Sequence, residues 1–270
     1  MNLNSAQTLC FKADQLKHIE VINYPDGQHS VRLDTSFFNL PTDRLVLKVR
    51  LRAFKELELF AGVVSALRHL GYPVKHVEFL YLFGLRSDRV FKEGEPNYFR
   101  DVVAPYINMM QFKEIKLVDP HGVGDQYLNA QNIYYSVPFA SELSNHTLVL
   151  GADRHSLHTR LHFEKKREGD SVQVWLAKEI HQKINEAEPH LPIVIADDLC
   201  DGGATFIAIA NYLRLNFPKR ERILYLTHGL FTKGITALLD AYKYVFVTNS
   251  YQDFPSHTNP RLRVKDVWTL

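Results

Sequence analysis

The stretch Ile193-Val194-Ile195-Ala196-Asp197-Asp198-Leu199-Cys200-Asp201-Gly202-Gly203-Ala204-Thr205 decides the fold of this chain. Its apolar start, bounded by polar residues, is typical of a buried parallel strand. Two acids and a glycine-rich turn follow, and then apolar residues recur at helical spacing at Phe206, Ile207, Ile209, Ala210 and Leu213. This arrangement suits a phosphorylated sugar, because N–H groups at a helix start bind phosphate and the carboxylates face ribose hydroxyls or their metal. The alternative is an ordinary strand-to-helix turn with acids at the N-cap.

Length and composition set the broad class. A chain of 270 residues is long enough for two α/β units, and 46% hydrophobic with 23% charged residues is typical of a soluble globular protein. The net charge of +2 predicts neither a nucleic-acid nor a membrane partner. Two cysteines, Cys10 and Cys200, are too few for a disulfide framework, so we expect a cytoplasmic protein. We also expect no signal peptide and no membrane span.

Strand-like runs alternate with helical stretches along the chain. The predicted strands are 19–22, 45–49, 77–82, 115–119, 147–151, 193–197, 223–227 and 245–248, with a further strand expected over 264–270. The predicted helices are a stripe over 57–67 that ends at Gly71, and the stretches 98–110 and 204–215. This alternation predicts α/β architecture with parallel sheets flanked by helices. Residues 132–138 show little periodicity, so we expect two domains, 1–137 and 138–270.

Four further clusters carry residues suited to phosphate or metal chemistry. They are Asn23-Tyr24-Pro25-Asp26-Gly27-Gln28, the charged loop 85–96, Val118-Asp119-Pro120-His121, and Gly151-Ala152-Asp153-Arg154 with the basic loop 163–170. Cations at the carboxyl end of a strand are typical of a phosphate-rich ligand site, and mobile Lys and Arg help where diphosphoryl charge develops. Alone, each cluster also fits a simpler interpretation: a turn, a solvated loop, a structural histidine or a charged surface.

Read in order, these motifs resemble the ribose-phosphate diphosphokinases, or phosphoribosyl-diphosphate (PRPP) synthetases. The matching segments are Tyr24-Pro25-Asp26-Gly27-Gln28, Arg86-Ser87-Asp88-Arg89, Gly94-Glu95-Pro96, Asp119-Pro120-His121, Gly151-Ala152-Asp153, Lys165-Lys166-Arg167, Thr227-His228-Gly229-Leu230-Phe231-Thr232-Lys233-Gly234 and Val247-Thr248-Asn249-Ser250. The glycine turn after Asp197 resembles the PRPP loop of type I phosphoribosyltransferases. The resemblance implies two tandem type I phosphoribosyltransferase-like domains, with ATP on the N-terminal side and the sugar-phosphate loop on the C-terminal side.

The implied reaction is transfer of the β,γ-diphosphoryl group of ATP to an anomeric ribose hydroxyl, with release of AMP. By resemblance, Lys165 and Arg167 are catalytic, and His121 and Asp153 hold Mg²⁺. The ATP-binding residues implied are Asp26, Arg86, Asp88, Arg89 and His121. The acceptor-binding residues implied are Asp197, Asp198, Asp201, Gly202, Gly203, Ala204 and Thr205. The family also implies a homo-oligomer, a dimer or a hexamer.

Two departures from the family bear on the acceptor. The segment 154–162 is short where the family inserts a glycine pair and a helix. The turn Gly202-Gly203-Ala204 lacks a hydroxyl that the family places there, which leaves room for an esterified 5′-phosphate. A divergent branch encoded by phages uses ADP-ribose, making ADP-ribose pyrophosphate for NAD salvage, and has loops of this kind. Ribose 5-phosphate and ADP-ribose therefore both stay open as acceptors.

Two other functional classes are weighed against a synthetase. A phosphoribosyltransferase shares the glycine turn but consumes the diphosphate, and has no need of the Arg86–Arg89 or Lys165–Arg167 segments. An inactive regulatory relative is the non-enzyme alternative. Such relatives lose the catalytic loop and metal residues, whereas Lys165, Arg167 and His121 are present here.

Overall fold

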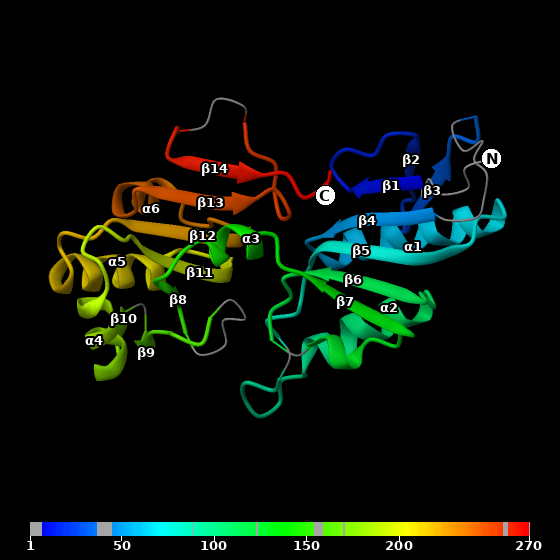
Figure 1. Ribbon diagram of the computed structural model, residues 1–270. Coiled ribbons are helices and arrows are strands. Elements are labelled where there is room, and N and C mark those ends of the chain that lie inside the picture. Colours follow the sequence, from blue (N-terminus) through cyan, green and yellow to red (C-terminus); the bar gives the residue numbers. More distant parts are fainter. Residues whose placement is uncertain are drawn as a thin grey trace. The chain divides into compact units, whose positions relative to one another are not determined.

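The computed structural model describes residues 7–36, 45–87, 89–122, 124–153, 159–169, 171–255 and 259–269. The chain divides into two compact units, Met1–Ser136 and Val137–Leu270. Each contains one five-stranded sheet in which all neighbouring strands are parallel (Figure 1). The α/β class with two parallel sheets flanked by helices is confirmed. Across the described ranges, no helix has both the length and the apolar character needed to cross a bilayer.

The N-terminal unit has the sheet order β1-β4-β5-β6-β7. Its elements are β1 (Gln7–Lys12), β2 (Ile19–Asn23), β3 (His29–Leu33), β4 (Leu45–Leu51), α1 (Phe54–His69), β5 (Val74–Leu82), the π-helical turn η1 (Phe99–Val103), α2 (Ala104–Met109), β6 (Glu114–Val118), the 3₁₀ turn η2 (Gly124–Tyr127) and β7 (Asn132–Ser136). The predicted strands 45–49, 77–82 and 115–119 correspond to β4, β5 and β6. The helical stretch 98–110 is present as η1 followed by α2.

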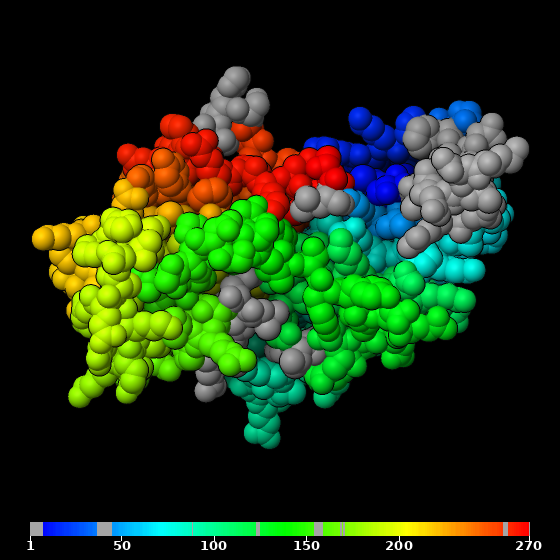
Figure 2. Space-filling model, in the orientation of Figure 1, coloured from blue at the N-terminus to red at the C-terminus, as the bar shows by residue number. Residues whose placement is uncertain are grey.

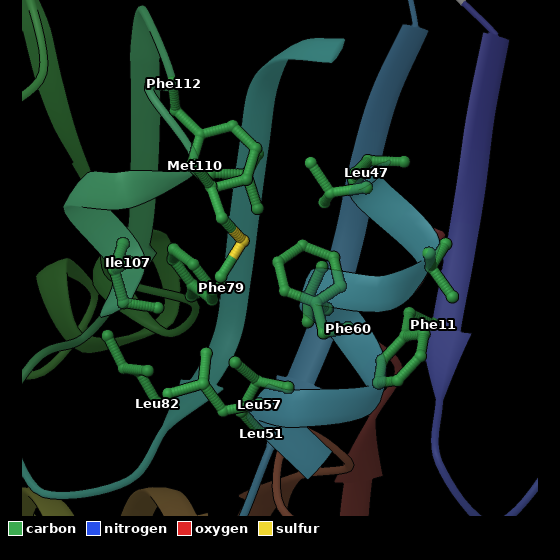
Figure 3. Close-up of a cluster of buried hydrophobic side chains, with 14 of the residues drawn as sticks. Phe11, Leu47, Leu51, Leu57, Phe60, Phe79, Leu82, Ile107, Met110 and Phe112 are labelled. Carbon is green, nitrogen blue, oxygen red and sulfur yellow. The ribbon is translucent and has the colours of Figure 1, made fainter. Parts of the chain in front are cut away.

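One face of this sheet packs against the buried stripe of α1. The ring of Phe60 lies 5.3 Å from that of Phe11 and 6.2 Å from that of Phe79, centroid to centroid (Figure 3). Alternate residues of a strand point to opposite faces, so Leu47 and Val49 of β4 join this cluster and the residues between them do not. The helical stripe predicted over 57–67 is confirmed, since the five side chains that form it are all buried: Leu57, Phe60, Val63, Val64 and Leu67.

Two strands of this unit differ from the sequence-based expectation. The predicted strand 19–22 exists as β2, but it pairs antiparallel with β3 outside the main sheet. The turn Tyr24–Gln28 between them is too short for the crossover that a parallel pair requires. Residues 132–136, which seemed to lack periodicity, form the edge strand β7. Their pattern is weak because an edge strand is only half covered: Tyr134 and Tyr135 are 51% and 53% exposed.

The C-terminal unit has the sheet order β14-β13-β12-β11-β8 (Figure 1). Its elements are α3 (Ala140–Ser144), β8 (Val149–Gly151), β9 (Glu164–Glu168), β10 (Ser171–Trp175), α4 (Lys178–Glu186), β11 (Ile193–Cys200), α5 (Ala204–Asn216), β12 (Arg222–Gly229), α6 (Thr236–Ala241), β13 (Tyr244–Thr248) and β14 (Leu262–Lys265). The predicted strands 147–151, 193–197, 223–227 and 245–248 and the helix 204–215 are present, and the strand expected over 264–270 corresponds to β14, which ends at Lys265. Strand β11 continues to Cys200 because its pairing with β12 continues there.

Strand β11 is covered on both of its faces. Ile193 and Ile195 belong to the cluster that includes the buried side chains of α5 and α6. Val194 and Ala196 belong to a second cluster with Phe139 and the α3 residue Leu143. A strand covered on both faces is apolar throughout, and this is the reason for its unbroken hydrophobic run.

The basic segment 164–168 is a strand and not the flexible loop expected from the sequence. It is β9, which pairs antiparallel with β10 in a two-stranded hairpin. Gly169, at φ +58°, begins the two-residue connection, where a hairpin turn favours a positive φ. Figure 2 shows this hairpin and α4, in lime and yellow-green, at the surface of the C-terminal unit. Cross-strand hydrogen bonds hold the segment extended despite its charged composition.

Candidate active site

Three acidic side chains lie at the carboxyl edge of the C-terminal sheet. Asp197 and Asp198 are part of β11, and Asp153 lies two residues beyond the end of β8. Strands β8 and β11 are paired in register, with Ala196 opposite Gly151. The carboxyl ends of parallel strands meet at one edge, so the two strands bring these acids together.

The electrostatics of Asp197 show that the three carboxylates interact. Removal from water raises the pKa of Asp197 well above its ordinary value of 3.8, and the negative charges of Asp198 and then Asp153 raise it further. The ammonium group of Lys165 acts in the opposite direction. The site therefore concentrates negative charge that a cation or a hydroxyl-rich ligand can compensate.

Lys165 brings a positive charge to this acidic edge from β9. Its Nζ lies 2.5 Å from Oδ2 of Asp153, and both side chains are partly exposed, at 36% and 21%. Arg167 is two residues further along β9, so it lies on the same face of the hairpin, exposed to solvent. The β9–β10 hairpin thus presents both predicted catalytic cations on one face.

The glycine turn connects β11 to α5. Gly203 is the residue before the helix and has φ +81°, a backbone conformation that favours glycine. Helix α5 begins at Ala204, so the N–H groups of Ala204, Thr205 and the next residue belong to the first turn, where a helix has no internal acceptors for them. These donors and the positive end of the helix dipole make the turn suitable for an anion.

A second segment, residues 229–234 after β12, packs against the glycine turn. The N–H of Leu230 donates to the Cys200 carbonyl at 2.9 Å, and that of Thr232 to the Asp201 carbonyl at 3.2 Å. The Thr232 hydroxyl also donates to Oδ1 of Asp201 at 2.7 Å. Gly229 is required here, because a Cβ at this position would lie 2.3 Å from Cε2 of Phe231.

Buried polar groups support this second segment from beneath. The Ser250 hydroxyl lies 2.7 Å from Nδ1 of His228 and donates to the Thr227 carbonyl at 3.2 Å. The Thr248 hydroxyl donates to the same carbonyl at 2.6 Å. Two motifs noted in the sequence, 227–234 and 247–250, are therefore one hydrogen-bonded structure. Its role is to fix the backbone that carries the loop.

Lys233 is a residue that the sequence analysis did not assign to the site. Three methylene carbons of its side chain lie 3.3–3.5 Å from where a Cβ of Gly202 would be. Little in the sequence indicates this contact, since a single lysine in a loop is normally solvated. Only the side-chain packing on Gly202 distinguishes it.

The other predicted residues belong to the N-terminal unit. Asp26 lies in the β2–β3 turn and accepts a hydrogen bond from the N–H of Gln28 at 3.1 Å. Arg86 and Arg89 are exposed in the loop after β5, with the Arg89 guanidinium 5.1 Å from the ring centre of Phe91. Asp88 lies outside the described residues.

His121 follows β6 and is half-buried. It is two residues beyond Asp119, which is fully buried and has φ +42°. A positive φ is uncommon for a residue other than glycine and is concentrated at functional sites. The structure thus gives Asp119 an unusual local backbone at the end of a sheet strand, two residues before His121.

The predicted metal site was tested against the side chains that are described. Among them, no three His, Cys, Asp or Glu side chains converge closely enough to bind a metal ion by themselves. Mg²⁺ in phosphoryl-transfer sites is held by one or two carboxylates together with substrate phosphates and water. The acidic edge formed by Asp153, Asp197 and Asp198 fits that kind of shared site.

Comparison with known proteins identifies relatives along most of the chain. The ribose-phosphate pyrophosphokinase of Pyrococcus furiosus is 26% identical over 254 residues, covering 87% of this chain and 86% of the relative. The Pyrococcus abyssi protein of the same name is also 26% identical, covering 87% and 85%. No family model matches the chain.

The fold has a counterpart among solved structures. The crystal structure of phosphoribosylpyrophosphate synthetase from Mycobacterium smegmatis superposes with a TM-score of 0.69, at 17% sequence identity, over 92% of this chain and 86% of that one. This likeness supports the two-domain α/β architecture, and the two Pyrococcus relatives support the family expected from the sequence motifs.

Proposed function

We propose that this chain, a member of the ribose-phosphate pyrophosphokinase family, is an ATP-dependent diphosphotransferase that acts on a ribose 5-phosphate-type acceptor. The anomeric hydroxyl of the acceptor attacks the β-phosphorus of ATP. The bond from that phosphorus to the α,β-bridging oxygen breaks, and AMP leaves. The hydroxyl proton is lost to the medium, so a diphosphorylated ribose and AMP are the products.

The observation that carries this proposal is the composition of the acidic edge. Two neighbouring carboxylates, Asp197 and Asp198, lead directly into a glycine turn at a helix start. A third, Asp153, is bonded to Lys165 on the hairpin. The carboxylates match the vicinal hydroxyls of a ribose, and the glycine turn matches a phosphate. The lysine matches the diphosphoryl group that is transferred.

Each group has a defined role in the proposal. Asp197 and Asp198 bind the ribose hydroxyls of the acceptor, directly or through metal, and the turn Asp201–Thr205 binds its 5′-phosphate. Lys165 and Arg167 stabilise negative charge on the diphosphoryl group as it is transferred. Phosphoryl transfer needs little covalent help from the protein, so positioning and charge stabilisation supply most of the acceleration.

The ATP side of the reaction belongs to the N-terminal unit in this proposal. Arg86 and Arg89 bind ATP phosphates or base from their exposed loop, with Asp88 in the same motif, and Asp26 lies near the adenine. His121 contacts the nucleotide or its metal. The chain has no G-x-x-x-x-G-K-[ST] motif, so the nucleotide is not held as in P-loop NTPases.

Mg²⁺ is the cofactor we propose. Asp153 would be one of its ligands, and Asp197 with Asp198 add carboxylate oxygens of the kind this ion prefers. When bound, the ion neutralises phosphate charge and orients the diphosphoryl group. The protein's own contribution is the carboxylate edge, whose mutual repulsion favours a bound cation.

Two acceptors fit the glycine turn. Ribose 5-phosphate would yield PRPP, and ADP-ribose would yield ADP-ribose pyrophosphate for NAD salvage. Gly202, Gly203 and Ala204 offer no hydroxyl and little bulk, which suits either a terminal or an esterified 5′-phosphate. Cytoplasmic location and homo-oligomeric assembly remain part of the proposal on the strength of the family alone.

The deciding experiment measures AMP release from ATP and Mg²⁺, with ribose 5-phosphate and ADP-ribose as acceptors in parallel. AMP formation with ribose 5-phosphate supports a PRPP synthetase, and formation only with ADP-ribose supports a role in NAD salvage. Absence of AMP with both, in a folded protein, would refute the proposal. It would favour a PRPP-consuming transferase or an inactive relative.

A further inference from the structure

Lys233 follows strand β12, next to the turn that starts α5. The strands β11 and β12 lie side by side (Figure 1), so the loops that leave their carboxyl ends are neighbours. Four hydrogen bonds join the two loops: the N–H groups of Leu230 and Phe231 donate to the Cys200 carbonyl, and the Thr232 N–H and hydroxyl donate to Asp201. The backbone that carries Lys233 is therefore fixed relative to the glycine turn.

The side chain of Lys233 crosses the face of Gly202. A Cβ on Gly202 would lie 3.3 Å from Cδ, 3.4 Å from Cγ and 3.5 Å from Cε of Lys233. Glycine thus leaves the space that the lysine stem occupies, and the stem buries apolar surface while its ammonium group stays in water. Because Nζ is one bond beyond Cε, the positive charge is held beside the Asp201–Thr205 turn.

The acidic side chains around the glycine turn would repel a phosphate unless a cation lies beside it. Asp197, Asp198 and Asp153 lie at the same edge of the sheet, and Asp201 is within the turn itself. The ammonium of Lys165 is bonded to Asp153. A phosphate that approaches this acidic edge is repelled, and a lysine bonded to it offsets the repulsion through a short charge-assisted hydrogen bond.

We propose that Lys233 binds the 5′-phosphate of the acceptor and takes the place of the hydroxyl that Gly202, Gly203 and Ala204 do not provide. This inference rests on the proposed function, because it assigns a further binding residue to the same site. Gly202 belongs to the same arrangement, because a Cβ there would lie 3.3 Å from Cδ of Lys233, tighter than an ordinary contact, so the lysine stem would have to shift. Lys233 does not touch the reacting phosphorus, so its effect is on acceptor binding.

The test compares Lys233→Ala and Lys233→Arg with the control Lys219→Ala. Lys219 is an exposed lysine between the end of α5 and the start of β12, at the opposite edge of the same sheet, so its replacement removes the same charge far from the turn. We expect Lys233→Ala to raise the KM for the acceptor about 10- to 100-fold, with kcat and the KM for ATP unchanged. Lys233→Arg should restore most of the affinity, and Lys219→Ala should match the wild type.

A double-mutant cycle tests the role of Gly202. Gly202→Ala should weaken acceptor binding in the wild-type background by displacing the lysine stem. It should have little further effect when Lys233 is already alanine. Equal effects of Gly202→Ala in both backgrounds would overturn the coupling and with it the assigned role of Lys233.

Calorimetric titration with ribose 5-phosphate separates this inference from the proposed function. If the wild type binds ribose 5-phosphate without forming AMP with either acceptor, and Lys233→Ala weakens that binding, the reaction is wrong and the phosphate site stands. If the wild type turns over and Lys233→Ala behaves like Lys219→Ala, the inference alone is overturned. If the wild type neither binds nor turns over an acceptor, both are overturned.

Discussion

Replacing Arg220 with methionine should destabilise the C-terminal unit strongly. Arg220 is 8% exposed and donates four hydrogen bonds to main-chain carbonyls at and just beyond the end of α4. The acceptors and distances are Ile184 (2.6 Å), Ala187 (2.7 Å), Glu188 (2.8 Å) and Leu191 (3.0 Å). The last carbonyls of a helix have no internal donors, and a cation there also interacts favourably with the helix dipole.

The magnitude follows from these bonds. A hydrogen bond to a charged group contributes about 1.5–3 kcal/mol, but four bonds to one group are not additive, so we expect a loss of about 3–5 kcal/mol. Methionine retains an unbranched apolar side chain, so the loss of stability comes mainly from removal of the guanidinium group and its hydrogen bonds. For a unit of this size, such a loss lowers the Tm by about 10–20 °C.

Tryptophan fluorescence isolates this effect. Both tryptophans of the chain, Trp175 and Trp268, lie in the C-terminal unit, so their emission during heating or urea unfolding reports that unit alone. The matched control is Arg214→Met, because Arg214 is exposed on α5 and donates a 3.3 Å hydrogen bond to the side chain of Asn211 instead of to main-chain carbonyls. If Arg220→Met and Arg214→Met change the Tm equally, the reasoning from the four carbonyl bonds is refuted.

Three further predictions concern the site. Lys165→Ala should lower kcat at least about 100-fold with little change in ATP affinity, because its charge acts on the transferred group; near-normal turnover would remove Lys165 from the mechanism. Asp197→Asn should stabilise the protein against urea at pH 7 while weakening acceptor binding. The folded-state pKa of Asp197 is raised, so ionisation of this carboxyl lowers the stability of the folded protein as the pH rises above the ordinary value of 3.8. The stability advantage of the variant should therefore shrink toward pH 3. An advantage that grows on acidification would contradict the assignment. Gly203→Ala should lower the free energy of unfolding by about 1–2 kcal/mol, because alanine is strained at the φ of +81° that Gly203 adopts. Urea titration should show a much smaller loss for Gly202→Ala, because the backbone of Gly202 does not have a positive φ.

The strands that the sequence predicted best are those buried on both faces. The unbroken apolar run from Ile193 to Ala196 predicts a strand that is buried on both faces, because every one of its side chains avoids water. Edge and hairpin strands were harder. Strand β7 carries exposed tyrosines, and all five residues of β9 are charged, so only their partners in the sheet or hairpin make them strands.

The site was predictable as a set of residues but not as a set of contacts. The acids Asp153 and Asp197 were each assigned from motifs, yet their interaction arises from the pairing of β8 with β11, more than 40 positions apart. The Lys165–Asp153 bond likewise depends on where the hairpin folds back. Lys233 was not predicted because its role is indicated only by the packing of its side chain on Gly202. The two residues are 31 positions apart, and the sequence alone does not show that they are in contact.

The double coverage of β11 has a consequence for how such a protein acquires new acceptors. Between Ile193 and Ala196, each change of side-chain volume disturbs packing on one face or the other, so the strand tolerates little variation. The glycine turn and the residues 230–234 lie beyond the last strand residues, and apart from Gly203 and Phe231, which pack against core side chains, they are less constrained by packing. Substitutions that change the acceptor are therefore expected in these two adjacent loops. A hydroxyl lost from one loop can be replaced by a lysine in the other while the scaffold stays unchanged.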